Sequence, residues 1–254
     1  MNTESDILLL IESLIKKGNK NMVSFKESLI SQLKDKFSIN TIKTIIKKKL
    51  SEKKIYFIRH AQAMHNVLEV KYFGDFSKCN VYDPELTEKG KEQTKKTIAK
   101  LQKEKINFDS VFVSPLKRAM ETYFLVKDYL NKNVKVYVTD FAKEVLSYCD
   151  KNKGMKLSSL KEQYAKDNLN FEYMTKEFWW FDLGEQKEGE LEKGLLFELR
   201  LRIFALWLFF RPENNILIIS HSHVFCELQD DGIYNADLVR MDNNTLMEKI
   251  FELF

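Results

Sequence analysis

Hydrophobic residues in the first fifty positions recur at the three- and four-residue spacing of amphipathic helices. The three apolar stripes are Ile7, Leu8, Ile11, Leu14 and Ile15; Phe25, Leu29, Ile30 and Leu33; and Ile39, Ile42, Ile45, Ile46 and Leu50. The segment SFKE at 24–27 has the composition of a capping box, which predicts a helix start at Ser24. We therefore expect three helices within residues 5–50, followed by a lysine-rich junction near residue 52.

Beyond that junction, short apolar runs alternate with longer amphipathic segments. The runs that predict strands are KIYFIRH at 54–60, DSVFVS at 109–114, VKVYV at 134–138, NILIISH at 215–221 and a terminal edge strand, LMEKIFELF, at 246–254. The segments that predict helices are 86–102, capped by Thr87; 114–130, with Ser114 as N-cap and Pro115 as first residue; and 201–210. Strands separated by helices predict an α/β fold with a mostly parallel sheet and helices on both faces.

Composition and charge add little to this picture. The chain has 254 residues, 44% hydrophobic, with 19 Phe and 10 Tyr, which is ample material for a core. The net charge of +4 is too mild to indicate a nucleic-acid partner, although residues 1–54 hold 12 Lys against 6 Asp and Glu. We expect two parts, a helical extension or small domain at 1–52 and a larger α/β domain at 53–254.

Three features of the sequence indicate an intracellular protein. Three widely spaced cysteines, Cys79, Cys149 and Cys226, are typical of free thiols in a reducing compartment. The apolar run ILLLI near the N-terminus is too short for a signal peptide. Charged residues interrupt the apolar segment at 195–210, which favours a buried amphipathic helix over a membrane span. We expect a cytoplasmic protein without a membrane partner, and a nuclear location stays open.

Polar residues stand where the predicted strands end, and ligands in open α/β sheets bind outside the carboxyl ends of strands. These residues are Arg59 and His60, Ser114 with Arg118 one turn later, Glu144, and His221. Arginines offer forked donors to a phosphate, a neutral imidazole can attack phosphorus, and a second histidine can stabilise the transferring group. A glutamate whose pKa is raised by burial can protonate the leaving oxygen. The pattern indicates phosphoryl transfer through histidine.

No step of that chemistry requires a metal or an organic cofactor. The chain has only four histidines, and no cysteine or histidine pair has zinc-finger spacing. We therefore expect neither a metal ion nor a cofactor.

The ordered segments RHAQAMHN, YDPELTEKGKEQT, DSVFVSPLKRAMET, FAKEVLSYCDKNKG and NILIISHSHVF resemble the histidine phosphatase superfamily, the phosphoglycerate mutase-like proteins. The resemblance covers about residues 54–254 and implies a three-layer α/β sandwich. The patterns RHAQxxHN and SPLxRxxxT are most similar to a phosphatase-type subgroup rather than to the glycolytic mutases.

The resemblance also implies roles for single residues. His60 becomes the phosphorylated nucleophile, Arg59 and Arg118 bind the phosphoryl group, and His221 completes the pocket. Asn66 matches the asparagine that closes the first loop over the phosphate. Glu144 matches the general acid, and Ser222 could offer its backbone amide.

This sequence departs from the family pattern at two places. The family often has glycine two residues after the second histidine, where His223 stands here. The segment around Glu144 lacks the longer insertion of the glycolytic mutases, which favours hydrolysis over mutase activity. For His65, a position facing the pocket and a helix-capping role stay open. We expect Trp179 and Trp180 to be core residues and His223 to be structural.

The N-terminal segment 23–52 resembles the helical domain at the C-terminus of the chromatin protein DEK. That resemblance implies a docking or nucleic-acid-binding module, but we favour helices that pack on the catalytic domain. The alternatives to a phosphatase are a mutase and a weakly active phospho-ligand-binding protein targeted by these basic helices. The expected partner is a small-molecule phosphomonoester. Phosphoprotein substrates, and the oligomeric state, stay open.

Overall fold

The computed structural model describes residues 3–18, 22–73, 75, 78–146, 150–180 and 194–254. Its centre is a six-stranded sheet with the order β4-β3-β2-β5-β1-β6. The strands are β1 Lys54–Arg59, β2 Ser110–Val113, β3 Lys135–Val138, β4 Leu169–Asn170, β5 Asn215–Ser220 and β6 Leu238–Arg240. Every neighbouring pair is parallel except β1 with β6. The expected α/β fold with a mostly parallel sheet is confirmed.

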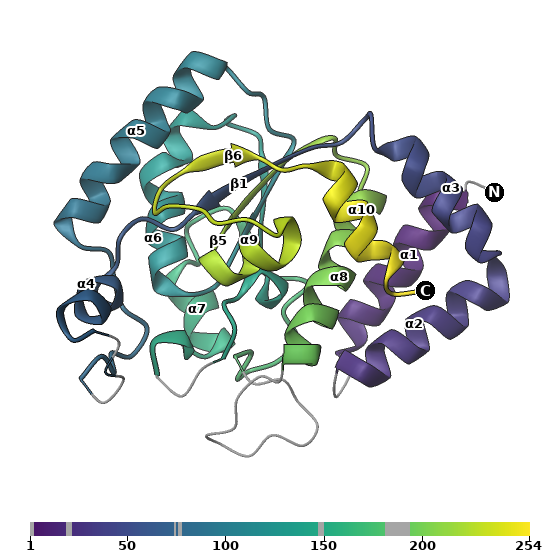
Figure 1. Cartoon of the computed structure of the whole chain (residues 1–254), viewed down its shortest axis with the longest axis horizontal. Coiled ribbons are helices and arrows are strands. Elements are labelled where there is room, and N and C mark those ends of the chain that lie inside the picture. Colours follow the sequence, from purple (N-terminus) through teal and green to yellow (C-terminus); the bar gives the residue numbers. More distant parts are fainter. Residues whose placement is uncertain (1–2, 19–21, 74, 76–77, 147–149, 181–193) are drawn as a thin grey trace.

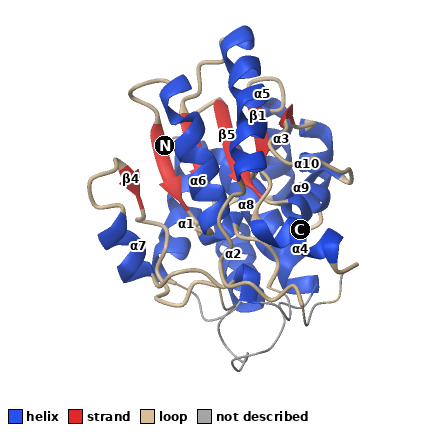
Figure 2. Cartoon of the chain, turned by 90° about the vertical axis from the view of Figure 1, so that its left-hand side faces the viewer, coloured by secondary structure: helices blue, strands red, loops and turns tan. Residues whose placement is uncertain are grey.

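Helices cover both faces of the sheet (Figures 1 and 2). The α-helices are α1 Thr3–Lys17, α2 Met22–Lys36, α3 Ile39–Lys49, α4 Met64–Lys71, α5 Glu88–Glu104, α6 Lys117–Val126, α7 Leu157–Gln163, α8 Gly194–Phe210, α9 Ser222–Gln229 and α10 Asn243–Phe251. The 3₁₀ turns are η1 Lys127–Tyr129, η2 Asp140–Ala142 and η3 Asp150–Asn152.

Side chains that alternate along each strand divide the core into two layers, one on each face of the sheet. On β5, Ile216 and Ile218 face a core shared with α1–α3, α8, α9 and α10. Leu217 and Ile219 face the opposite core, shared with α5, α6 and α7. Successive side chains of a strand point to opposite faces, so apolar runs such as NILIIS suit a strand buried on both sides. The result is helix, sheet and helix, in three layers.

Helix α8 is the central element of the first core. Its residues from Ile203 to Phe210 are all buried, whereas Gly194 and Leu195 at its start are exposed. The buried stretch is apolar around its whole circumference rather than amphipathic as expected, because the sheet covers one side while α1, α2, α3 and α10 cover the others. Figure 1 shows these helices gathered around α8 at one end of the molecule. Within the described residues, no helix is long and apolar enough to cross a membrane.

A buried polar network also joins the N-terminal helices to the sheet. Arg211, just after α8, donates to Glu12 on α1 at 2.6 Å and to Glu213 at 2.7 Å. It donates further to the hydroxyls of Tyr137 on β3, at 2.8 Å, and Tyr173, at 3.3 Å. The cation is therefore compensated although it is buried, and α1 is tied to the sheet by charge as well as by apolar packing.

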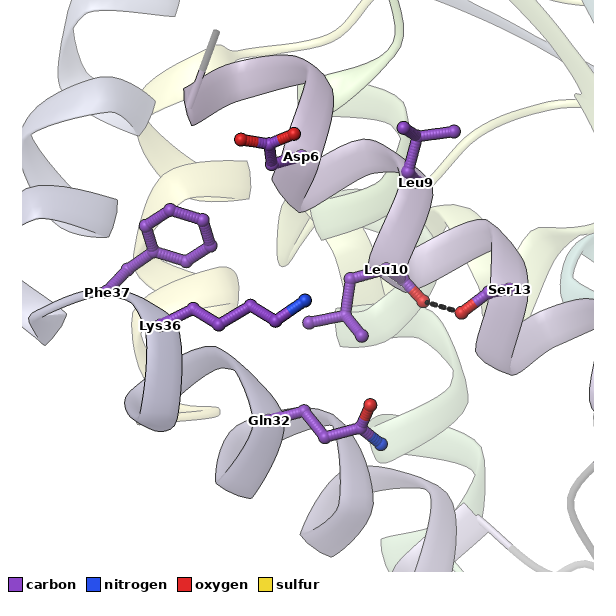
Figure 3. Close-up of a pocket in the computed structure, with 7 residues that line it drawn as sticks. All are labelled: Asp6, Leu9, Leu10, Ser13, Gln32, Lys36 and Phe37. Carbon is purple, nitrogen blue, oxygen red and sulfur yellow. Dashed lines mark hydrogen bonds between the residues drawn. The ribbon is translucent and has the colours of Figure 1, made fainter. Parts of the chain in front are cut away.

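The N-terminal helices carry a surface groove of about 630 Å³ (Figure 3). The residues that line it are Asp6, Leu9, Leu10, Ser13, Gln32, Lys36 and Phe37. All of them belong to α1, α2 or the residue after α2, so the groove is separate from the strand ends.

Three local predictions are wrong. The C-terminal segment forms α10 rather than an edge strand, because Asp242 caps a helix whose Leu246 and Ile250 share one buried face. Helix α6 begins at Lys117 rather than at Pro115. Helix α2 already includes Met22, so Ser24 lies within the helix and is not its N-cap.

Other local predictions are confirmed. Thr87 caps α5, since its hydroxyl accepts from the amide of Gly90 at 3.0 Å. Trp179 and Trp180 are both buried, and Trp179 Nε1 donates to the carbonyl of Met155 at 2.7 Å. Cys79 and Cys226 are free thiols, whereas Cys149 lies outside the described residues.

Candidate active site

Four parallel strands, β1, β2, β3 and β5, end at one edge of the sheet. The residues that follow them and carry polar side chains are Arg59, the last of β1, with His60 next; Ser114 after β2; Glu144 after β3 and η2; and His221 after β5. The ladder between β1 and β5 continues one residue further, because the amide of His60 donates to the carbonyl of Ser220 at 2.8 Å. The strand register therefore brings the two histidines side by side.

The ring of His60 is buried, with 2% of the residue exposed. Its Nδ1 lies 2.7 Å from the carbonyl oxygen of Ala61, and a carbonyl only accepts, so Nδ1 carries the proton. Its Nε2 accepts from Arg118 Nε at 3.3 Å. Burial and the charge of Arg118 hold the pKa of His60 well below its usual range. The ring is therefore neutral, with the lone pair on Nε2, which is the nucleophilic form.

Two more histidine rings lie against His60. The ring centroids are 5.1 Å away for His221 and 5.6 Å away for His65. His221 Nε2 lies 2.7 Å from Ser114 Oγ, and its Nδ1 is buried with no hydrogen-bond partner among the described residues. Burial, with the charge of Arg118 adding to it, lowers the pKa of both rings. Three neutral imidazoles thus line one pocket.

Asn66 determines which nitrogen of His65 carries the proton. The amide of Ala63 donates to Asn66 Oδ1 at 3.0 Å, so the amide nitrogen of Asn66 is the atom that lies 3.0 Å from His65 Nε2. An amide nitrogen only donates, so His65 Nε2 accepts and Nδ1 carries the proton. This Nδ1 is buried and has no partner within the described part of the chain. His65 lies inside α4, beside His60, with one nitrogen that has no protein partner in the described residues.

The guanidinium of Arg118 is held on three sides. Besides its bond to His60, Nη1 donates to the carbonyl of Lys151 at 2.8 Å and Nη2 donates to Asn152 Oδ1 at 2.7 Å. Burial lowers the pKa of Arg118 to about 10, so the group stays cationic at neutral pH. A fixed cation next to the nucleophile is what binding of a phosphoryl group requires.

Arg59, which directly precedes His60, supplies a second cation near this ring. Its Nη1 donates to the carbonyl of Ile233 at 2.8 Å, while its Nε is buried without a partner among the described residues. Burial lowers the pKa of Arg59, and the charge of Glu144 opposes that effect. This half-buried side chain keeps donor capacity for a ligand.

Glu144 is buried, and both of its oxygens are engaged. Oε1 accepts from the amide of Val145 at 2.9 Å, and Oε2 accepts from His223 Nδ1 at 3.1 Å. Burial alone would raise the pKa of this carboxyl, but the hydrogen bond and charge of His223 outweigh it, and the pKa lies below the usual value. Without a bound anion, Glu144 therefore lacks the raised pKa that a general acid needs, and His223 is the reason.

Sequence reasoning missed residues that hold the site in place. Thr122 Oγ1 accepts from the amide of Ala61 at 3.0 Å and donates to the carbonyl of Arg118 at 2.7 Å, so it joins the first loop to α6. Asp83 Oδ1 accepts from the amide of Lys117 at 2.9 Å and thereby caps α6 from another segment. Both residues lie within the recognised motifs, at Thr122 of SPLKRAMET and Asp83 of YDPELT, but spacing alone assigns them no contact.

Three nitrogens of this cluster, Arg59 Nε, His65 Nδ1 and His221 Nδ1, are buried without a protein partner in the described residues. Buried polar atoms are normally hydrogen-bonded, so this concentration around His60 marks a position for an anionic ligand. Ser222 opens α9 directly after His221, where the first amides of a helix also suit an anion. No group of three or more His, Cys, Asp or Glu side chains within the described residues could hold a metal ion.

Comparisons with known proteins identify the family of the chain. The model of the histidine phosphatase superfamily (branch 1) matches residues 55–243. A probable phosphatase of Schizosaccharomyces pombe is 35% identical over 71 residues, which are 28% of this chain and 30% of the relative. The match therefore spans under a third of that relative's length.

Solved structures share the fold at low identity. The ecdysone phosphate phosphatase of Bombix mori, in complex with tungstate, has a TM-score of 0.50 and 15% identity, over 73% of this chain and 87% of that one. A putative α-ribazole-5'-P phosphatase of Escherichia coli has a TM-score of 0.44 and 22% identity, over 69% of this chain and 79% of that one. Because the family model covers most of the chain, the chain belongs to the histidine phosphatase superfamily, branch 1.

Proposed function

We propose that this protein is a metal-independent phosphomonoester hydrolase that works through a phosphohistidine on His60. One observation carries the proposal: the Nε2 lone pair of the buried His60 lies near the two guanidinium groups of Arg59 and Arg118. Near it, too, are the three buried nitrogens without a protein partner in the described residues. Such a pocket favours a phosphate dianion, and it presents a nucleophile to the phosphorus.

In the first step, His60 Nε2 attacks the phosphorus while Arg59 and Arg118 bind the phosphoryl oxygens. The bond to the leaving oxygen breaks, and Glu144 gives that oxygen a proton. The hydrogen bond from His60 Nδ1 to the carbonyl of Ala61 strengthens as the ring becomes positive, which stabilises the phosphohistidine. Water then attacks the phosphorus with Glu144 as base, and His60 is released.

His221 and His65 act as neutral donors or acceptors at the pocket wall, where each has one nitrogen without a protein partner among the described residues. Asn66 orients His65, and the amide of Ser222 adds a donor at the start of α9. The substrate is a small-molecule phosphomonoester. The positive charges needed for the phosphate come from arginine side chains, so the reaction should persist in a chelator.

The test is hydrolysis of a generic aryl phosphate in EDTA, comparing the wild type with His60→Ala. We expect EDTA-resistant turnover in the wild type and its loss in the variant, because no other lone pair takes the place of His60 Nε2. Brief mixing with ³²P-labelled substrate and an alkaline quench should trap a phosphohistidine in the wild type only. A Lys89→Ala variant, altered at an exposed residue of α5, serves as the control that keeps activity.

Turnover that persists in His60→Ala would show that another residue is the nucleophile. A wild type that binds phosphate but forms no phosphoenzyme with any phosphomonoester would favour the binding-protein alternative instead.

A further inference from the structure

Glu144 and His223 form a hydrogen-bonded pair that reaches from the buried pocket to the surface. The contact joins Glu144 Oε2 to His223 Nδ1 at 3.1 Å, and the backbone amide of His223 lies 3.4 Å from the same oxygen. The side chain of Glu144 is 9% exposed, whereas that of His223 is 68% exposed. One end of the pair is thus closed off from water and the other end is open to it.

A buried carboxylate that must donate a proton needs a route by which the proton arrives. Direct exchange between Glu144 and bulk water is hindered by burial, and its second oxygen is occupied by the amide of Val145. The open ring of His223 is a titratable group hydrogen-bonded to the carboxylate, and it can exchange with solvent near neutral pH.

The charged groups around the pair favour a proton on the imidazole in the unliganded site. Glu144 raises the pKa of His223, while Lys151 and Arg59 oppose that effect. On α9, the helix that carries His223, Cys226 and Glu227 stand one turn further on, and Lys249 of α10 lies 4.0 Å from Glu227. The raised pKa of His223 and the lowered pKa of Glu144 favour an imidazolium beside a carboxylate over a neutral pair.

We propose that His223 is the positioning residue that loads Glu144 with its catalytic proton and that takes up, in the second half of each cycle, the proton that Glu144 abstracts from water. The inference rests on the proposed function, because it assigns a proton source to the general acid of that reaction. It differs from the expectation that His223 has a purely structural role.

The cycle balances in protons. When the phosphate dianion binds beside Glu144, the proton moves from His223 Nδ1 to Glu144 Oε2 and then to the leaving oxygen as the phosphorus–oxygen bond breaks and the bond to His60 forms. The alcohol departs with that proton. In the second half, water gives a proton to Glu144 and hydroxide to phosphorus. The phosphorus–nitrogen bond breaks, and the proton returns to His223.

The experiment compares the wild type with His223→Gln, whose amide can still donate to Glu144 but cannot titrate. Two substrates are used, an alkyl phosphate with a poor leaving group and a nitrophenyl phosphate with a good one. For the alkyl phosphate we expect kcat to fall on the order of 100-fold, within the range of general acid catalysis. For the nitrophenyl phosphate we expect little change, because that leaving group departs without a proton.

The pH profile gives a second readout. In the wild type the required proton is shared by the pair, so alkyl phosphate turnover is lost only as pH rises through the raised pKa of His223. In His223→Gln the proton must reside on Glu144 alone, so the alkaline limb should move to lower pH. Imidazole added to His223→Ala should restore part of the alkyl phosphate turnover, since this position is open to solvent. Lys89→Ala, the exposed control on α5, should keep the wild-type profile.

Two outcomes would overturn the inference. His223 would not supply the proton if His223→Gln slowed both substrates equally. The same conclusion would follow if the variant still phosphorylated His60 but changed neither the ratio of the two turnover rates nor the alkaline limb. If the wild type formed no phosphohistidine, the proposed function would fail, and the inference would fall with it.

Discussion

Protonation in the pocket is decided by single hydrogen bonds at the scale of residues. The carbonyl of Ala61 places the proton of His60 on Nδ1, and the amide of Asn66 places that of His65 on Nδ1. Each of these partners is the next residue in the chain after the histidine that it orients. One short segment, RHAQAMHN, therefore contains both rings and the groups that set their tautomers. Arg118 comes from another element, and its charge adds to burial in lowering the pKa of His60.

A first prediction concerns this arginine. In Arg118→Lys a single ammonium cannot contact His60, Lys151 and Asn152 together, as the three-way guanidinium does. Loss of a charged hydrogen bond costs about 1.5–3 kcal/mol, so kcat/KM for aryl phosphate should fall by roughly tenfold to a hundredfold. Steady-state kinetics measure the change, and Arg240→Lys, at the exposed last residue of β6, is the matched control. Equal activity of both variants would remove Arg118 from the phosphate site.

At the scale of elements, capping residues decide whether a segment with an ambiguous apolar pattern forms a helix or a strand, and where a helix begins. The segment 246–254 has apolar residues that satisfy either a helix or a half-buried strand. Asp242 resolves it, because its carboxylate accepts from the amides of Asn244 and Thr245 at the start of α10. At α6 the capping carboxylate, Asp83, comes from a distant segment, so no local pattern around Ser114 could reveal the true helix start.

The second prediction follows from the α10 cap. Asp242→Ala should destabilise the protein by about 1 kcal/mol, the usual cost of losing an N-cap. Hydrogen bonds from Thr245 and Asn244 lower the pKa of Asp242, so its stabilisation is present above the carboxyl's unfolded pKa and is lost as pH falls through the lowered folded value. Urea unfolding should show a difference between variant and wild type at pH 7 that shrinks in acid. A difference that grew in acid would contradict the capping role.

At the scale of the whole molecule, helix α8 joins the N-terminal helices to the sheet. It packs on the sheet with one side and on α1, α2, α3 and α10 with the others, so the N-terminal helices complete the core of the part that carries the site. Their packing supports the interpretation of residues 1–52 as an extension that stabilises the catalytic part. Arg211 and Glu12 add an ion pair across this boundary.

The third prediction tests that interpretation by truncation. Removal of residues 1–52 would expose the outer surface of α8 and leave Arg211 without Glu12, so we expect an aggregating product or one without a cooperative thermal transition. In the full chain, Glu12→Ala should cost about 1.5–3 kcal/mol in urea unfolding, as expected for hydrogen bonds to a charged group. Glu27→Ala, at an exposed position of α2, should change little. A soluble, cooperatively folding fragment 53–254 would instead indicate two independent domains.

Local signals in the sequence determined the class of the fold and which candidate site residues stand at the strand ends. Apolar runs long enough only for strands, separated by helical periodicity, required a parallel sheet, and polar residues at the ends of those runs had to meet at one edge. Helix ends at α2, α6 and α10 escaped prediction, because capping depends on which group reaches the first free amides.

Tertiary structure alone decided the contacts between segments distant in the chain. The pairing of Glu144 with His223 joins residues 79 positions apart, and it reverses the shift in pKa that burial of the carboxyl would cause. The enclosure of α8 by α1–α3 likewise depends on packing, since an apolar helix indicates only that it is buried and not what covers it. Periodicity in the sequence indicates which face of an element is apolar. Only the assembly of the elements decides which element packs on that face and which group pairs with each buried charge.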